Sequence, residues 1–135
     1  MVEYITGING IGKTRVLLET AIATADKSKG NVVFLDCSNK LNLILPKSIR
    51  LINPKEYGIN SARGLCGFLI GLCASDFDLT DIFVDSVMDI FENNDTNIDD
   101  FMEVITKSAR NTDVNFHFSV NDVYEKEVIY QSVCE

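Results

Sequence analysis

Residues Gly7 to Thr14 read Gly-Ile-Asn-Gly-Ile-Gly-Lys-Thr and fit the pattern G-x-x-x-x-G-K-[ST] at every fixed position. Glycine adopts backbone conformations that are closed to residues with a Cβ atom, so successive N–H groups can converge on an anion. The lysine adds an ammonium group for phosphate oxygens, and the threonine adds a hydroxyl group that suits Mg²⁺. This stretch therefore predicts a loop that binds the phosphates of a nucleoside triphosphate together with Mg²⁺.

The lysine of this loop carries the largest expected share of the binding. Its ammonium is placed on the β and γ phosphates, and the N-terminus of the following helix adds partial positive charge. We expect removal of Lys13 to damage binding or turnover most. The residues predicted to contact the nucleotide are Gly7, Asn9, Gly10, Ile11, Gly12, Lys13, Thr14 and Arg15.

Two carboxylates further along the chain supply the other groups that hydrolysis needs. Asp85 closes the run Asp-Ile-Phe-Val-Asp and is predicted to hold Mg²⁺ with Thr14, directly or through a water. Asp36 closes an earlier apolar run and could accept a hydrogen bond from a water aligned on the γ phosphate. The predicted catalytic residues are thus Lys13, Asp36 and Asp85, although ordinary strand-ending carboxylates remain an alternative for both acids.

Other polar residues carry weaker signals. Ser119 and Asn121 follow a later strand, where they could sense the γ phosphate or simply form a turn. His117, the only histidine, is predicted to alternate with Phe116 and Phe118 on a sheet face rather than to carry chemistry. A solvated loop is predicted for the acidic residues Asp76, Asp78 and Asp81.

The elements that must position these residues alternate along the chain. Strands are predicted at residues 2–6, 31–37, 48–52, 81–85, 114–120 and 127–133, and helices at 14–29, 60–73, 87–91 and 98–109. Such alternation implies right-handed crossovers. We therefore expect a single domain, residues 1–135, with a mostly parallel central sheet in a three-layer αβα fold. The helix at 60–73 is apolar on most faces, which leaves burial in the core and burial at an interface both open.

Composition sets further bounds. The 135 residues are 46% hydrophobic and 24% charged, which is typical of a globular domain. A net charge of −8 argues against a broad electrostatic affinity for nucleic acid. No secretory signal and no membrane span is recognisable, so a cytoplasmic location is expected. Free thiols are predicted for Cys37, Cys66, Cys73 and Cys134, which are too widely spaced for a C-x-x-C pair.

The order of three segments, Gly7 to Thr14, Val32 to Asp36 and Ile82 to Val87, resembles the RecA/KaiC-like branch of P-loop ATPases. This resemblance, which covers residues 2–121, implies a P-loop NTPase fold and an Mg²⁺-dependent ATPase that works with a protein partner or as an oligomer. It places Asp85 at the Mg²⁺-supporting aspartate and Asp36 where relatives usually have a water-activating glutamate. The shorter aspartate implies weak intrinsic hydrolysis.

Two other classes remain open. A small-molecule or nucleotide kinase would use Asp36 as the base on an acceptor hydroxyl, but its arginine-rich lid fits poorly with the four arginines of this chain. A non-hydrolysing module would use nucleotide binding to control a partner surface on the helix at 60–73. The loop is also similar to that of ABC-type ATPases, but Ser86 stands where those proteins have a catalytic glutamate. ATP is favoured as the ligand because an N-K-x-D guanine motif is absent.

Overall fold

The computed structural model describes residues 1–7, 12–38, 40–41, 44–92, 98–121 and 129–133. Strands and helices alternate along most of this length, as predicted. The strands are β1 (Val2–Gly7), β2 (Asn31–Leu35), β3 (Ile49–Ile52), β4 (Leu79–Val84), β5 (Asn115–Asn121) and β6 (Ile129–Val133). The helices are α1 (Lys13–Lys27), α2 (Ala62–Ser75), α3 (Val87–Ile90) and α4 (Ile98–Ala109), with a 3₁₀ turn η1 at Pro54–Tyr57.

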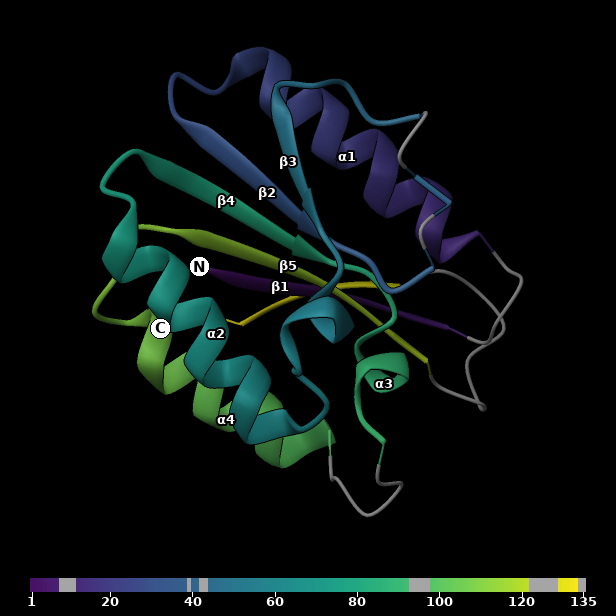
Figure 1. Ribbon diagram of the computed structural model, residues 1–135, viewed down its shortest axis with the longest axis vertical. Coiled ribbons are helices and arrows are strands. Elements are labelled where there is room, and N and C mark those ends of the chain that lie inside the picture. The colour runs from purple at the N-terminus through teal and green to yellow at the C-terminus, as the bar shows by residue number, and fades with distance from the viewer. Residues whose placement is uncertain (8–11, 39, 42–43, 93–97, 122–128, 134–135) are drawn as a thin grey trace.

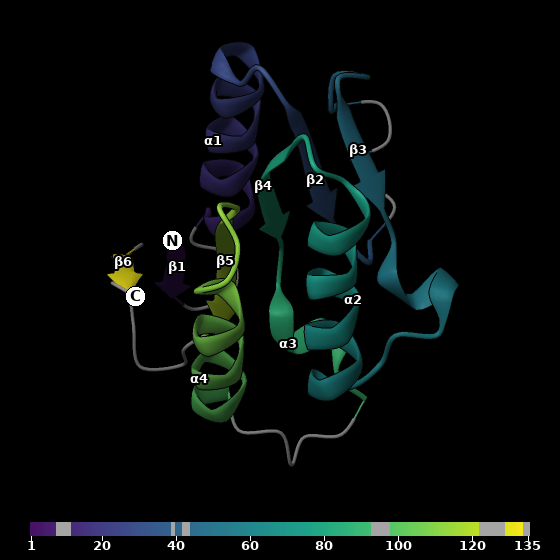
Figure 2. The same ribbon diagram turned by 90° about the vertical axis from the view of Figure 1, so that its left-hand side faces the viewer.

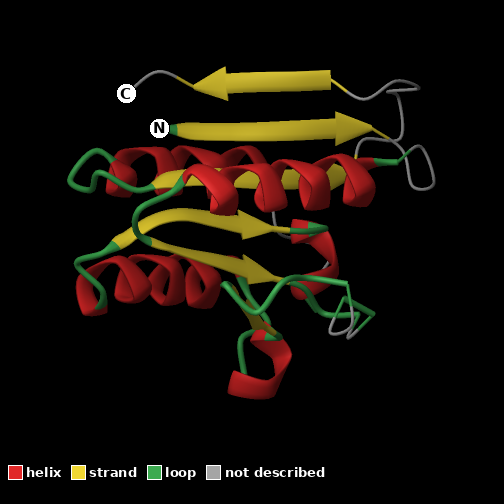
Figure 3. Cartoon of the chain, turned by 90° about the horizontal axis from the view of Figure 1, so that it is seen from above, coloured by secondary structure: helices red, strands yellow, loops and turns green. Residues whose placement is uncertain are grey.

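All six strands join one sheet in the order β3-β2-β4-β5-β1-β6. The first five in sequence run parallel, and β6 pairs antiparallel with β1 at one edge (Figure 3). The short strand β3 forms the other edge, and prolines on both sides of it, Pro46 and Pro54, are typical of an edge strand. The α/β class and the mostly parallel sheet are thus confirmed.

Helices cover both faces of the sheet. Figure 2 shows α1 on one side of the sheet and α2 with α4 on the other. Alternate residues of β2 serve the two faces, since Val32 and Phe34 pack in the α1 core while Val33 and Leu35 pack in the α2/α4 core. This arrangement is consistent with the predicted three-layer αβα architecture.

Helix α2 lies within two residues of its predicted range, 60–73, at both ends. The Ser61 Oγ accepts a hydrogen bond from the Gly64 N–H at 3.0 Å and caps the helix. Leu65 and Leu69 are fully buried against the sheet, which favours the core role for this face of the helix. Within the described part of the chain, every helix is too short or too polar to cross a lipid bilayer.

Candidate functional site

The candidate site lies at the carboxyl edge of the parallel strands. There the chain leaves β1 for α1 on one face of the sheet, and leaves β4 for α4 on the other face (Figure 1). Ligands of open α/β sheets bind at such a point, outside the carboxyl ends of the strands. The segments that follow β1, β2 and β4 carry the predicted site residues Lys13 and Thr14, Asp36, and Asp85 respectively.

The predicted phosphate loop joins β1 to α1. Gly7 ends β1, and Gly12 precedes α1 with a φ of 99°, which lies in the left-handed region that favours glycine. No acidic residue stands in the first turn of α1, so the helix itself places no side-chain anion beside its first N–H groups. Three predicted nucleotide contacts, Asn9, Gly10 and Ile11, lie outside the described residues.

Lys13 opens helix α1 and is buried, with 5% of its surface exposed. Burial lowers the pKa of its ammonium group, and the carboxylates of Asp85 and Asp89 act in the opposite direction. A cation is therefore held in the same corner of the molecule as two carboxylates, as a site for a phosphate and a divalent cation requires.

Thr14 and Asp85 meet directly. The Thr14 hydroxyl donates a hydrogen bond to Asp85 Oδ2 at 2.9 Å, and the Ser119 hydroxyl donates one to Asp85 Oδ1 at 2.6 Å. The Ser119 oxygen also accepts a bond of 2.6 Å from the Ser86 N–H. Three strands thus converge here, because Thr14 follows β1, Asp85 follows β4 and Ser119 lies in β5.

The backbone turns sharply after Asp85. Ser86 has a φ of 52°, the only positive value at a non-glycine position among the described residues. Such a conformation costs about 1 kcal/mol or more and persists where the surrounding contacts enforce it. Here the bond from the Ser86 N–H to Ser119 supplies one such contact.

The surroundings of Asp85 disfavour the ionised form of its carboxyl group. The side chain is buried, and burial raises the pKa of its carboxyl group. The hydrogen bonds from Ser119 and Thr14 lower the pKa, while the nearby carboxylates of Asp36 and Asp89 raise it further. A bound cation would relieve this accumulation of negative charge.

Asp36 stands directly after β2, as predicted, and is buried. Its Oδ2 accepts a hydrogen bond of 2.6 Å from the Ser38 hydroxyl. Asp36 lines the same cavity of about 430 Å³ as Thr14, Asp85 and Asp89. The two predicted acids, Asp36 and Asp85, and the predicted Mg²⁺ ligand Thr14 therefore line one cavity.

Arg15 is not among the residues that line that cavity. Its guanidinium pairs with Glu19 at 3.4 Å on the exposed surface of α1. Arg15 does line a neighbouring cavity of about 450 Å³, together with the apolar side chains of Leu18, Leu41 and Ile44. This second cavity also contains Lys13 and Thr14, so the two cavities meet at the start of α1.

Two residues of the site, Asp89 and Ser38, were not predicted from the sequence. Asp89, in the short helix α3, lines the first cavity, and Ser38 binds Asp36. An acid four positions after a predicted Mg²⁺ ligand, at the start of a helix, could have suggested Asp89. For Ser119 the sequence left a γ-phosphate contact and a turn both open, and in the structure its hydroxyl donates a hydrogen bond to Asp85. The side chain of Asn121 is not described.

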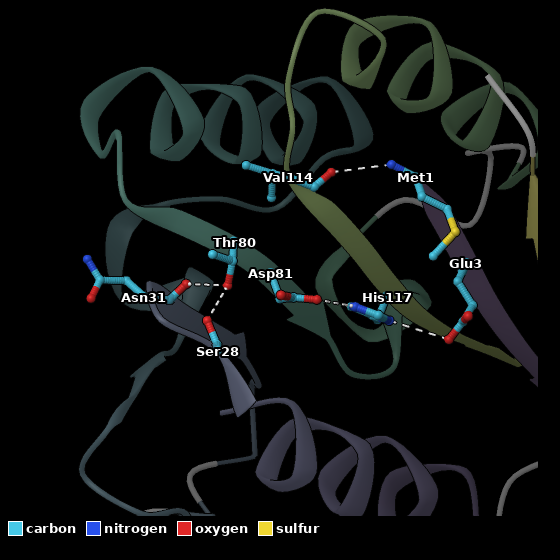
Figure 4. A network of polar contacts seen from close by, with 8 residues as sticks. All are labelled: Met1, Glu3, Ser28, Asn31, Thr80, Asp81, Val114 and His117. Carbon is cyan, nitrogen blue, oxygen red and sulfur yellow. Dashed lines mark hydrogen bonds and ion pairs between the residues drawn. The ribbon is translucent and has the colours of Figure 1, made fainter. Parts of the chain in front are cut away.

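Asp81 was predicted both to begin a strand at 81–85 and to belong to a solvated acidic loop; the strand prediction is confirmed and the loop prediction is wrong. Strand β4 begins at Leu79, so Asp81 lies inside it and is buried. Asp81 Oδ2 lies 2.8 Å from Nε2 of His117, whose Nδ1 lies 3.4 Å from Oε1 of Glu3 (Figure 4). His117 also stacks on Phe83, with ring centroids 4.2 Å apart. The histidine thus lies on the opposite face of the sheet from Phe116 and Phe118. Its two ring nitrogens contact the carboxylates of Asp81 and Glu3.

The three described cysteines are free thiols and half-buried, whereas Cys134 lies outside the described residues. Burial raises the pKa of all three, that of Cys66 to about 11. Cys37 lines the first cavity beside Asp36. A raised pKa disfavours the thiolate, so these residues are suited to packing rather than nucleophilic chemistry.

The oxygen atoms of Thr14 and Asp85 are donors that suit Mg²⁺ when phosphate oxygens and waters supply its other ligands. Across the described ranges, no three His, Cys, Asp or Glu side chains are grouped closely enough to hold a metal ion by themselves. Mg²⁺ commonly takes one or two protein carboxylates and completes its shell with phosphate oxygens and waters. The hydroxyl of Thr14 and the carboxylate of Asp85 fit that mode. Comparison of the chain with known protein families and with curated protein sequences found no match.

Proposed function

We propose that this protein binds ATP with Mg²⁺ at the carboxyl edge of its sheet and hydrolyses it slowly, as a RecA-like P-loop ATPase. The observation that carries the proposal is the hydrogen bond between Thr14 and Asp85, beside the N-terminus of α1. It brings together the hydroxyl and the carboxylate that a phosphate-bound Mg²⁺ needs, although one comes from the loop pattern and the other from a distant strand.

Each residue has a defined part in this proposal. The N–H groups at the start of α1 and the Lys13 ammonium bind the β and γ phosphates. Thr14 and Asp85 hold Mg²⁺, which neutralises phosphate charge when it is bound. The Asp36 carboxylate orients a water toward the γ phosphate by accepting its hydrogen bond. The cavity lined by Leu18 and Leu41 offers an apolar surface to the base.

The proposal includes slow turnover and a need for a further cation. Asp36 is one C–C bond shorter than the glutamate of the resembled family, and Ser38 already occupies its Oδ2. Among the described residues that line the two cavities, Arg15 is the one arginine, and it pairs with Glu19. A protein partner or a second copy that supplied an Arg or Lys would complete the charge stabilisation.

Phosphate release from ATP with Mg²⁺ tests the proposal. Slow release by the wild type, abolished by Asp85→Ala and lowered by Asp36→Ala, is the expected result. The matched control Asp26→Ala removes an exposed acid on α1 and should release phosphate at the wild-type rate. Binding without release would favour a nucleotide-controlled interaction module. Transfer to an added small-molecule acceptor, without free phosphate, would favour a kinase.

A further inference from the structure

A second surface lies at the opposite end of the strands from the candidate nucleotide site. The turn between α2 and β4 presents the Phe77 side chain with 102% exposure, the highest value among the large apolar residues described. Burying a phenylalanine side chain is worth about 1.5–3 kcal/mol, so its full exposure forgoes that stabilisation. A single exposed apolar residue is common on protein surfaces, so the significance of Phe77 depends on the residues that surround it.

The turn holds Phe77 outward by several hydrogen bonds. Asp76 Oδ1 accepts from the Asp78 N–H at 2.9 Å, and Asp76 Oδ2 accepts from the Asn31 side-chain amide at 2.8 Å. The Asn31 N–H donates to the Asp78 carbonyl at 2.8 Å. Phe77 thus lies in a turn between α2 and β4 that hydrogen bonds hold to β2.

An apolar groove lies beside this turn. A cavity of about 620 Å³ separates the last turns of α2 and α4, and Phe77 forms part of its wall. Figure 1 shows the two helices side by side, with their C-terminal ends near this edge of the sheet. The apolar lining comes from Ile70, Cys73, Leu79 and Val114.

The rim of the groove is negative. Asp76 and Asp113 line it, and Asp78 follows Phe77 directly. Both helices end here, so their C-terminal carbonyl groups add partial negative charge, and α2 has no basic residue in its last turn. The last-turn lysine of α4, Lys107, is paired with Glu103 at 3.0 Å. Exposed cations in neighbouring turns, Lys29 and Arg110, lie outside the groove lining.

We propose that this groove docks a segment of a partner protein in which an apolar side chain is flanked by Lys or Arg. The apolar side chain enters the groove and packs on Phe77, and the basic side chains meet the acidic rim and the carbonyl ends of the helices. This inference goes beyond the ATPase proposal and does not depend on it, since no residue of the groove lines the nucleotide site.

Titration of the ¹⁵N-labelled chain with two capped peptides, Arg-Leu-Phe-Arg and Glu-Leu-Phe-Glu, tests the inference by amide chemical shifts. The basic peptide should give saturable shifts at Ala74, Phe77 and Thr112 in the millimolar range, and the acidic peptide should not. Phe77→Ala and Asp113→Asn should each weaken binding on the order of tenfold. Val104→Ala removes another exposed apolar side chain, on α4, and should bind like the wild type.

Three results would overturn the inference: equal shifts with both peptides, shifts remote from the groove, or no saturable shift with the basic peptide at millimolar concentration. Sedimentation of the wild type tests whether a second copy of the chain occupies the groove instead. A dimer that Phe77→Ala converts to monomer would assign the groove to a second copy and contradict a basic partner. Because Phe77 is fully exposed, this variant should keep the wild-type melting temperature. ATP binding is measured separately, so failure here leaves the nucleotide proposal unaffected.

Discussion

Thr14 donates a hydrogen bond to Asp85 over 2.9 Å, although 71 positions separate the two residues in the chain. The contact joins the start of α1 to the end of β4 across the carboxyl edge of the sheet. Ser119 binds the other oxygen of the same carboxylate at 2.6 Å, so both oxygens of Asp85 are oriented by hydroxyl groups. This orientation leads to predictions about stability and about cation-dependent binding.

Ser119→Ala should lower the free energy of unfolding by about 2 kcal/mol, because Asp85 and the Ser86 N–H both lose a buried partner. The variant should also weaken Mg²⁺-dependent ATP binding on the order of tenfold, as Asp85 loses its orientation. Urea unfolding and a binding titration measure the two effects. Ser75→Ala, which removes an exposed hydroxyl bonded only within its own helix, is the control. Equal stability of the two variants would contradict the role assigned to Ser119.

Asp85→Asn should stabilise the nucleotide-free protein at neutral pH by about 1 kcal/mol while it removes Mg²⁺-dependent binding. Burial raises the pKa of Asp85, so the folded state binds a proton more readily than the unfolded state. The wild type therefore loses stability as pH rises from the ordinary value of 3.8 through the folded pKa. Asparagine does not titrate, so the advantage of the variant should shrink as pH falls. Urea unfolding across this range measures it, and a pH-independent difference would refute the explanation.

Much of the site could be predicted because its residues follow strong local patterns. Glycine spacing marks the loop, and apolar runs that end in Asp36 and Asp85 mark buried strands with carboxylates at their carboxyl ends. The partners of those carboxylates could not be predicted in the same way. Ser119 reaches Asp85 only because β5 lies beside β4, and strand order is a property of the tertiary fold rather than of periodicity.

The wrong prediction at Asp81 has a related cause. Aspartate is disfavoured in strands and usually solvated, so three acids close together indicated a loop. The sheet overrides this preference because β5 places His117 beside Asp81 and gives the buried carboxylate a partner. Asp76 and Asp78 are not buried and do lie before β4, outside the strand.

His117→Ala should destabilise the fold by about 3 kcal/mol, because it leaves the Asp81 carboxylate buried without its partner. Adding Asp81→Asn to this variant removes the stranded charge and should recover part of the loss. A double-mutant cycle by chemical denaturation measures the coupling. Additive effects of the two substitutions would show that the pair has no energetic role.

Gly30→Ala should cost about 1–3 kcal/mol, because a Cβ atom there would clash with the Asp78 carbonyl oxygen and lie 2.6 Å from Thr80 Cγ2. Gly67→Ala is the matched control, since a Cβ atom on this exposed face of α2 meets nothing within 4 Å. Alanine in a helix should stabilise by about 0.5–1 kcal/mol. Thermal unfolding of the two variants should therefore shift in opposite directions, and a shared direction would contradict the packing at Gly30.

The most direct test of the central claim is calorimetric binding of ATP with Mg²⁺ to the wild type, to Lys13→Ala and to Lys27→Ala. The two lysines stand at the first and last positions of α1, but only Lys13 is buried beside Asp85. We predict saturable binding to the wild type and to Lys27→Ala, and binding at least about tenfold weaker in Lys13→Ala, since a charged hydrogen bond is lost. Absence of ATP binding to the folded wild type at millimolar concentration, or equal binding by both variants, would contradict the assignment of this site.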